Sequence, residues 1–161
     1  MPRLAAPALD VSVLVNAPAD AAFRAFFDHD ALGRWWQVVR SVATPRTLGA
    51  FALEWTPTEY RDDRLGRLGG VFRGTVMHAD EGHGFFVADA YWLPPDGEPI
   101  GPMALEVSFA PEHGPDGEVR TRVRVEQNGF EESVRWRRYY EVLGIGWERA
   151  LQSLKVLLEL T

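Results

Sequence analysis

Four side chains around one predicted turn form the set with the clearest metal-binding chemistry. They are two imidazoles and two carboxylates: His78, Asp80, Glu81 and His83. These residue types bind zinc or nickel when they converge on one point. Asp and Gly are also common in turns because they suit the backbone geometry there. We therefore interpret the group as an ordinary turn, assign no metal ligands and expect no cofactor.

Motifs for nucleophilic or phosphate chemistry are missing from the sequence. The chain has no cysteine, no Gly-x-Ser-x-Gly nucleophile elbow and no Gly-x-x-x-x-Gly-Lys-Ser/Thr phosphate loop. The glycine-rich stretch 65–70 lies in a predicted loop between strands and is interpreted as a flexible turn. Glu54, Asp89 and Glu106 lie opposite apolar positions, so we expect them to point to solvent. An inward carboxylate would instead have a raised pKa and could act as an acid or base. We assign no catalytic residue.

The first elements that must position any site lie before residue 37. A half-buried strand is predicted at 9–15, where apolar and polar residues alternate. Pro18 suits the first turn of a helix, because its missing N–H is not needed there. Asp28 or Asp30 suits the cap of a second short helix that ends near Trp36.

In the rest of the chain, the spacing at which apolar residues recur changes twice. Between Gln37 and Gln127 apolar and polar residues alternate, and short turns rich in Gly, Pro and Asp separate the runs. Strands joined by such short turns are antiparallel, because parallel neighbours need a long crossover. From Ser133 to Leu160 apolar residues recur every three or four positions, which predicts one long helix. We predict an α+β fold in a single domain spanning residues 1–161, with a curved antiparallel sheet of about six or seven strands wrapped on the long C-terminal helix.

Several motifs, in this order, resemble one superfamily. They are Asn16-Ala17-Pro18, Trp35-Trp36, Leu48-Gly49-Ala50-Phe51, residues 70–76 (GVFRGTV), Asn128-Gly129-Phe130 and residues 146–154 (GWERALQSL). The chain resembles the START/polyketide-cyclase (SRPBCC, Bet v 1-like) superfamily, and within it the branch of the activator of heat-shock-protein ATPase homologues, which has many small bacterial members. The resemblance implies a helix-grip fold with a cavity between the long helix and the sheet.

Aromatic residues are the unusual feature of the composition, with nine Phe, six Trp and four Tyr. They either fill the core or line a pocket for a flat or apolar ligand, and the resemblance favours the pocket. Such a pocket also holds a few polar groups, which Tyr139 or Tyr140, Arg73 and His78 could supply. The residues expected to line it face inward in the predicted elements: Trp36, Leu53, Trp55, Phe86, Trp92, Leu105, Val107, Phe130, Tyr140, Trp147 and Leu151.

Charge and cysteine content restrict the partners and the compartment. The formal net charge is -6 and the pI is near 5.2, which argues against binding to phosphate backbones. No apolar run is long enough to span a membrane. The absence of cysteine is compatible with a reducing cytoplasm, where we expect the protein to act as a monomer or a homodimer.

The sequence is compatible with three functions. The first is binding of a small hydrophobic or aromatic molecule, lipid included, in the cavity without covalent chemistry. The second is a polyketide cyclase or hydrolase-like enzyme that uses the same cavity and one buried polar residue. The third is an interaction module that assists a chaperone, which predicts a sizeable exposed apolar patch.

Overall fold

The protein is described here by a computed structural model, which covers residues 8–129 and 133–160. Within these residues one large antiparallel sheet has the strand order β1-β9-β8-β7-β6-β3-β2. Its strands are β1 (Ala8–Val15), β2 (Arg40–Ala43), β3 (Ala50–Trp55), β6 (Gly70–Asp80), β7 (Gly84–Leu93), β8 (Ile100–His113) and β9 (Val119–Gly129). A small hairpin, β4 (Arg61–Asp62) and β5 (Gly66–Arg67), interrupts the connection between β3 and β6.

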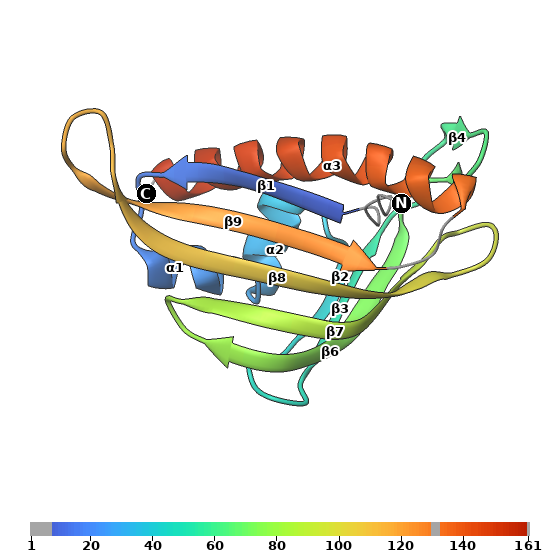
Figure 1. Cartoon of the computed structure of the whole chain (residues 1–161), viewed down its shortest axis with the longest axis horizontal. Coiled ribbons are helices and arrows are strands. Elements are labelled where there is room, and N and C mark those ends of the chain that lie inside the picture. The colour runs from blue at the N-terminus through green and yellow to red at the C-terminus, as the bar shows by residue number, and fades with distance from the viewer. Residues whose placement is uncertain (1–7, 130–132, 161) are drawn as a thin grey trace, which may run out of the picture.

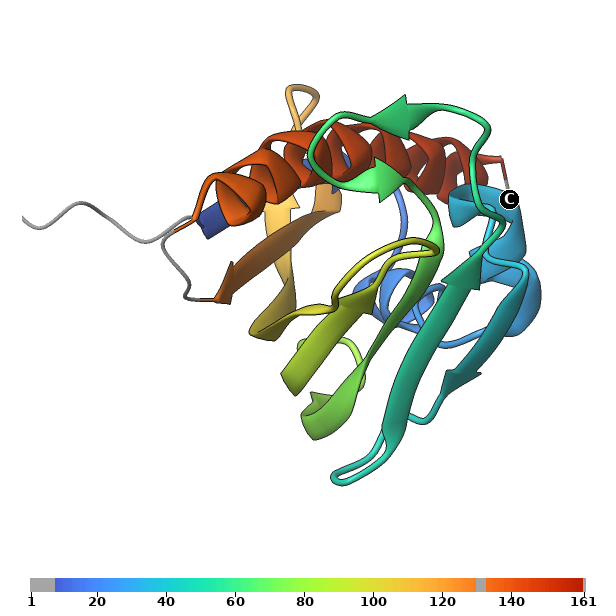
Figure 2. The same cartoon turned by 90° about the vertical axis from the view of Figure 1, so that its right-hand side faces the viewer.

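The long helix α3 (Val134–Glu159) lies across the concave side of the curved sheet (Figures 1 and 2). Ser133 caps its first turn, since the hydroxyl accepts a hydrogen bond from the N–H of Trp136 at 3.2 Å. The buried stripe of this helix contains Trp136, Tyr139, Tyr140, Trp147, Ala150, Leu151 and Leu154. The predicted α+β helix-grip fold is therefore confirmed.

Two short helices fill the space between β1 and β2. Helix α1 (Ala19–Arg24) begins after Pro18, and α2 (His29–Trp36) begins after Asp28, whose carboxylate accepts a hydrogen bond from the N–H of Ala31 at 2.9 Å. Helix α2 ends at Gln37, which adopts a left-handed backbone with a φ of 56°. This ending directs the chain back towards the sheet and places Trp36 beside the end of β3.

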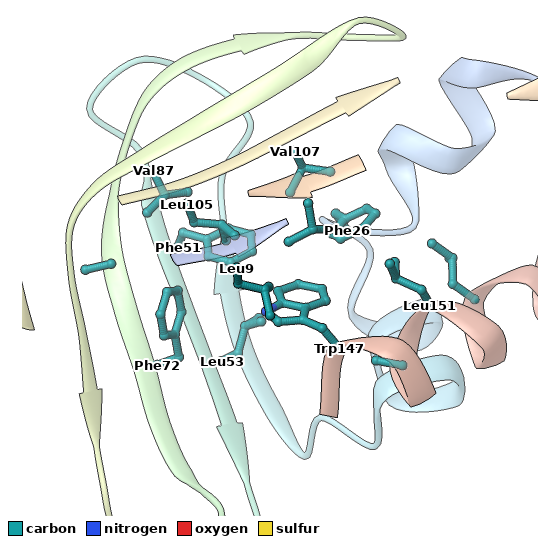
Figure 3. Close-up of a cluster of buried hydrophobic side chains, with 14 of the residues drawn as sticks. Leu9, Phe26, Phe51, Leu53, Phe72, Val87, Leu105, Val107, Trp147 and Leu151 are labelled. Atoms are coloured by element: carbon teal, nitrogen blue, oxygen red, sulfur yellow. The ribbon is translucent and has the colours of Figure 1, made fainter. Parts of the chain in front are cut away.

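The interior is filled differently at its two ends. At the end near α1, phenylalanines from the helix region and from three strands pack edge to face: Phe23, Phe26, Phe27, Phe51, Phe85 and Phe109. Aliphatic residues continue this core towards α3, as the converging side chains of Leu53, Leu105, Val107 and Leu151 show (Figure 3). At the other end, between α3 and the loop 56–69, four tryptophans gather around a cavity.

The predicted inward face of β7 is wrong by one residue at Phe86. Phe85 and Val87 are buried in β7, whereas Phe86 lies on the outer face opposite the exposed Glu106. The pairing of β7 with β8 shifts between Val87 and Ala90, where Asp89 has a φ of 52°. This β-bulge inserts an extra residue, so Ala90 and Trp92 face inward again, and Trp92 does so as predicted.

Candidate functional site

A cavity of about 530 Å³ lies between α3, the end of α2, the loop 56–69 and the concave face of the sheet. Its wall contains four tryptophans, a tyrosine and a phenylalanine. The full lining is Trp36, Gln37, Val39, Trp55, Thr56, Thr58, Leu65, Leu68, Gly69, Phe72, Trp92, Gln127, Tyr139, Val142, Leu143, Gly146 and Trp147. The volume lies in the range of pockets that hold small organic molecules.

The mouth and the floor of the cavity differ in exposure. The lining residues that are exposed to solvent are Gln37, Val39, Thr56 and Gly146. Those that form the floor are buried: Leu65, Phe72, Trp92, Gln127, Tyr139 and Trp147. An added Cβ at Gly146 would meet no atom within 4 Å. The helix thus has open space at this glycine, which forms one side of the mouth.

One polar cluster interrupts the apolar floor. Gln127 lies on the inward face of β9 and is only 1% exposed. Its Oε1 accepts a hydrogen bond from Trp147 Nε1 at 3.0 Å, and its Nε2 donates to the hydroxyl of Tyr139 at 3.3 Å. Burial raises the pKa of Tyr139 well above its ordinary value of 10.0, so this hydroxyl stays protonated at neutral pH.

The tryptophan walls are held in place by hydrogen bonds from their indole N–H groups. Trp55 Nε1 donates to the carbonyl of Trp36 at 2.8 Å, and Trp92 Nε1 donates to the carbonyl of Gly69 at 2.8 Å. Because these donors are occupied by the protein, the rings offer the cavity mainly their carbon faces.

The loop 56–69 closes one side of the cavity and is fastened to α3. Asp62 is 3% exposed and accepts hydrogen bonds from the backbone N–H groups of Arg64 and Leu65, both at 3.0 Å. The same carboxylate forms an ion pair with Arg138 of α3 at 2.7 Å. These contacts lower the pKa of Asp62 and hold Leu65, which is 2% exposed, against the cavity.

The sequence of this chain also identifies its relatives. The sequence model of the family described as activator of Hsp90 ATPase homolog 1-like protein matches residues 16–159. The chain belongs to this family. The superfamily and branch that the sequence motifs resemble are thereby confirmed. A search of curated protein sequences found no significant match.

Solved structures with this fold come from several bacteria. Protein MLL2253 from Mesorhizobium loti is 20% identical, with a TM-score of 0.69, 96% of this chain covered and 98% of the other. A protein from Rhodobacter sphaeroides is 17% identical, with a TM-score of 0.71 and coverage of 98% and 95%. The Aha1 dimer from Colwellia psychrerythraea is 19% identical, with a TM-score of 0.60 and coverage of 94% and 96%. At these identities the likeness shows the shared fold alone.

The residues predicted as cavity lining in this family member are distributed over several places. Those that line the cavity are Trp36, Trp55, Trp92 and Trp147. Those buried in the core instead are Leu53, Leu105, Val107, Tyr140 and Leu151. Phe86 lies on the outer face of β7 for the reason given above, and Phe130 lies outside the described residues.

Gln127 is missing from the predicted lining, and Tyr139 is predicted only as an alternative to Tyr140 for a polar group of the pocket. Gln127 follows Val123 and Val125 on the buried face of β9, so it is a polar residue in an apolar pattern. That break in the pattern was the available signal. Tyr139 precedes Tyr140 in α3, and the buried stripe of the helix is wide enough to include both. Leu65 and Leu68 also line the cavity, but they lie in a loop, where no periodic pattern of apolar residues could predict this.

The charged side chains and the histidines of residues 8–129 and 133–160 lie outside the cavity lining, and Arg73 and His78 are exposed on β6. His83 Nδ1 lies 3.4 Å from Asp80 on the surface, and Glu81 pairs with Arg24 at 3.0 Å. Among the described residues, no group of three or more His, Asp and Glu side chains is placed to hold a metal ion. Glu106 and Asp89 are exposed, and Glu54 pairs with Arg40 at 2.9 Å, so the three carboxylates do not line the cavity.

Proposed function

We propose that the protein binds a small, uncharged, largely apolar molecule in the tryptophan-lined cavity, without covalent chemistry. One observation carries the proposal: within the described chain, the cavity of about 530 Å³ is lined entirely by uncharged side chains. A charged ligand would lose its hydration there without gaining an opposite charge. An apolar one would exchange water for aromatic and aliphatic surface.

The two other functions have less support. An acid–base enzyme needs a group with a pKa near the working pH. The titratable side chain in the described lining is Tyr139, and burial moves its pKa away from neutrality.

A chaperone-assisting module would need a contiguous exposed apolar surface. The exposed apolar residues of α3 within the described chain are Val134, Ile145 and Val156. They are eleven positions apart, which is about 16 Å along a helix, so they do not form one patch. Among all the described residues, 8–129 and 133–160, no helix is long and apolar enough to span a membrane.

Native mass spectrometry of protein purified from its own host tests the proposal. We expect the wild type to carry one small molecule per chain, which denaturing extraction then identifies. The Gly146→Phe variant, which narrows the mouth, should carry much less of it. Gly146→Ala is the matched control and should keep it, because the added methyl group meets no neighbour within 4 Å. A wild type without bound molecule, or equal occupancy in Gly146→Phe, would contradict the proposal.

A further inference from the structure

We propose that the ligand is a flat, neutral molecule with an oxygen acceptor, such as a ketone or quinone carbonyl, which accepts a hydrogen bond from the Tyr139 hydroxyl. This inference rests on the proposed function and adds the polar group that the ligand must carry. Its basis is the direction of the hydrogen bonds in the buried cluster of Tyr139, Gln127 and Trp147.

The orientation of the Gln127 amide is determined by its neighbour on α3. An indole N–H can only donate, so the side-chain atom of Gln127 that faces Trp147 Nε1 at 3.0 Å must be the oxygen. The amide nitrogen therefore faces the other way. It lies 3.3 Å from the Tyr139 hydroxyl and 3.5 Å from the sulfur of Met103, and donates to both.

This direction leaves one buried donor in the floor of the cavity for a ligand. Because the Tyr139 oxygen accepts from Gln127, its own hydrogen is free to be donated. No residue in the described part of the chain accepts that hydrogen, although Tyr139 is buried and lines the cavity. A buried donor without an acceptor is costly, and an acceptor on the ligand removes that cost.

The walls around this donor indicate the shape of the ligand. The Tyr139 ring stacks on Trp92, with ring centroids 5.2 Å apart and an angle of 20° between the planes. Trp36 and Trp147 form a second aromatic wall, with centroids 4.5 Å apart. The N–H groups of Trp55, Trp92 and Trp147 are occupied by protein acceptors. Flat aromatic faces next to a directed, buried hydroxyl match a ring system with a carbonyl oxygen at its edge.

Two probes of the same shape separate this inference from simple apolar binding. Fluorene and fluorenone share three fused rings and differ in a methylene and a carbonyl group. We would measure both dissociation constants by quenching of tryptophan fluorescence, for the wild type, Tyr139→Phe and Tyr140→Phe. Tyr140 is the matched control: it is also buried in α3, but it does not line the cavity.

In Tyr139→Phe the affinity for fluorenone should fall roughly three- to tenfold relative to that for fluorene, as expected for one neutral hydrogen bond. In Tyr140→Phe the ratio of the two affinities should equal that of the wild type. As a second readout on the wild type, the infrared carbonyl stretch of bound fluorenone should shift to lower frequency than in an apolar solvent.

Three results would overturn the inference, and they have different meanings. If both probes bind but the ratio is the same in the wild type and Tyr139→Phe, Tyr139 does not select the ligand, while the proposed function stands. If neither probe binds the wild type, the flat aromatic class itself is wrong. An unshifted carbonyl stretch also contradicts the inference, and it does so without any variant.

Discussion

Gln127 shows how one buried side chain combines stability with recognition. Moving an amide out of water costs free energy unless the protein replaces its hydrogen bonds to water. Gln127 gains partners on both sides, Trp147 at 3.0 Å and Tyr139 at 3.3 Å, and it links β9 to α3 through them. The same bonds direct the Tyr139 hydroxyl, so the floor of the cavity and the attachment of the helix depend on one residue.

Replacing Trp147 by Phe tests this dependence. The substitution removes the indole N–H and leaves Gln127 Oε1 buried without its donor. We expect the free energy of unfolding in urea to fall by roughly 1–3 kcal/mol more than in Trp36→Phe. Trp36 is a matched control because it also lines the cavity and contacts Trp147, but it is only half-buried. Equal losses in the two variants would show that the N–H of Trp147 adds nothing.

The individual residues that line the cavity were only partly predictable from sequence. Alternation in β9 identifies Gln127 as an inward position, but its role depends on Trp147, twenty residues further along the chain. The four tryptophans that the sequence predicts in the lining lie near the ends of α2, β3 and β7 and in the middle of α3. At these positions, the predicted inward face of the helix or strand is enough to indicate that the large ring points into the cavity.

At the scale of the elements, the bulge in β7 decides which aromatic residues face inward. Phe85, Phe86, Val87 and Ala88 are all apolar, so alternation could not choose between the two faces of this strand. The deciding feature is the left-handed backbone of Asp89, with a φ of 52°. Asp tolerates that conformation, but it is common in ordinary turns and strand ends as well. The bulge therefore could not be inferred from sequence, whereas the helices, with their caps and regular stripes, could.

The conformation of Asp89 can be tested with two substitutions at this exposed site. Asp89→Asn should leave the free energy of unfolding nearly unchanged, because Asn also adopts left-handed conformations. Asp89→Val should lower it by about 1–2 kcal/mol, since a branched Cβ is strained there. Chemical denaturation of both variants measures the difference. A Val variant as stable as the Asn variant would mean that the strand lacks the bulge.

For the whole molecule, closure over the cavity depends on a contact between distant segments. The loop 56–69 contacts α3 through Asp62 and Arg138, which are 76 residues apart. Glu141 also pairs with Arg138, at 3.0 Å, on the solvent side. Neither the position of this loop nor its role in the cavity wall follows from local sequence, because Gly66 and Gly69 indicate turns but not what the turns cover.

The ion pair makes closure depend on pH. The pKa of Asp62 in the folded protein lies below its ordinary value of 3.8, so its contribution to stability is present above that value. The contribution is lost as the pH falls through the folded-state pKa. We expect Asp62→Asn to be less stable than the wild type at pH 7, with faster amide hydrogen exchange in residues 56–69. The difference in stability should shrink as the pH falls below 3.8.

Glu141→Gln is the control for this prediction. It alters a partner of the same arginine, but Glu141 is exposed, so the stability should change little. A wild-type advantage over Asp62→Asn that stays constant down to the lowest pH would show that the carboxylate charge does not hold the loop.

The tryptophans around α2 also give the protein optical properties of its own. Trp36 stacks on Trp35 at 4.9 Å and lies 5.1 Å from Trp55 and 4.5 Å from Trp147, measured between ring centroids. Rings this close share their electronic excitation, so light absorbed by one indole is passed to the others before it is emitted. Because Trp36, Trp55 and Trp147 line the cavity, the ultraviolet emission and circular dichroism of the protein report directly on whether that space is empty or occupied.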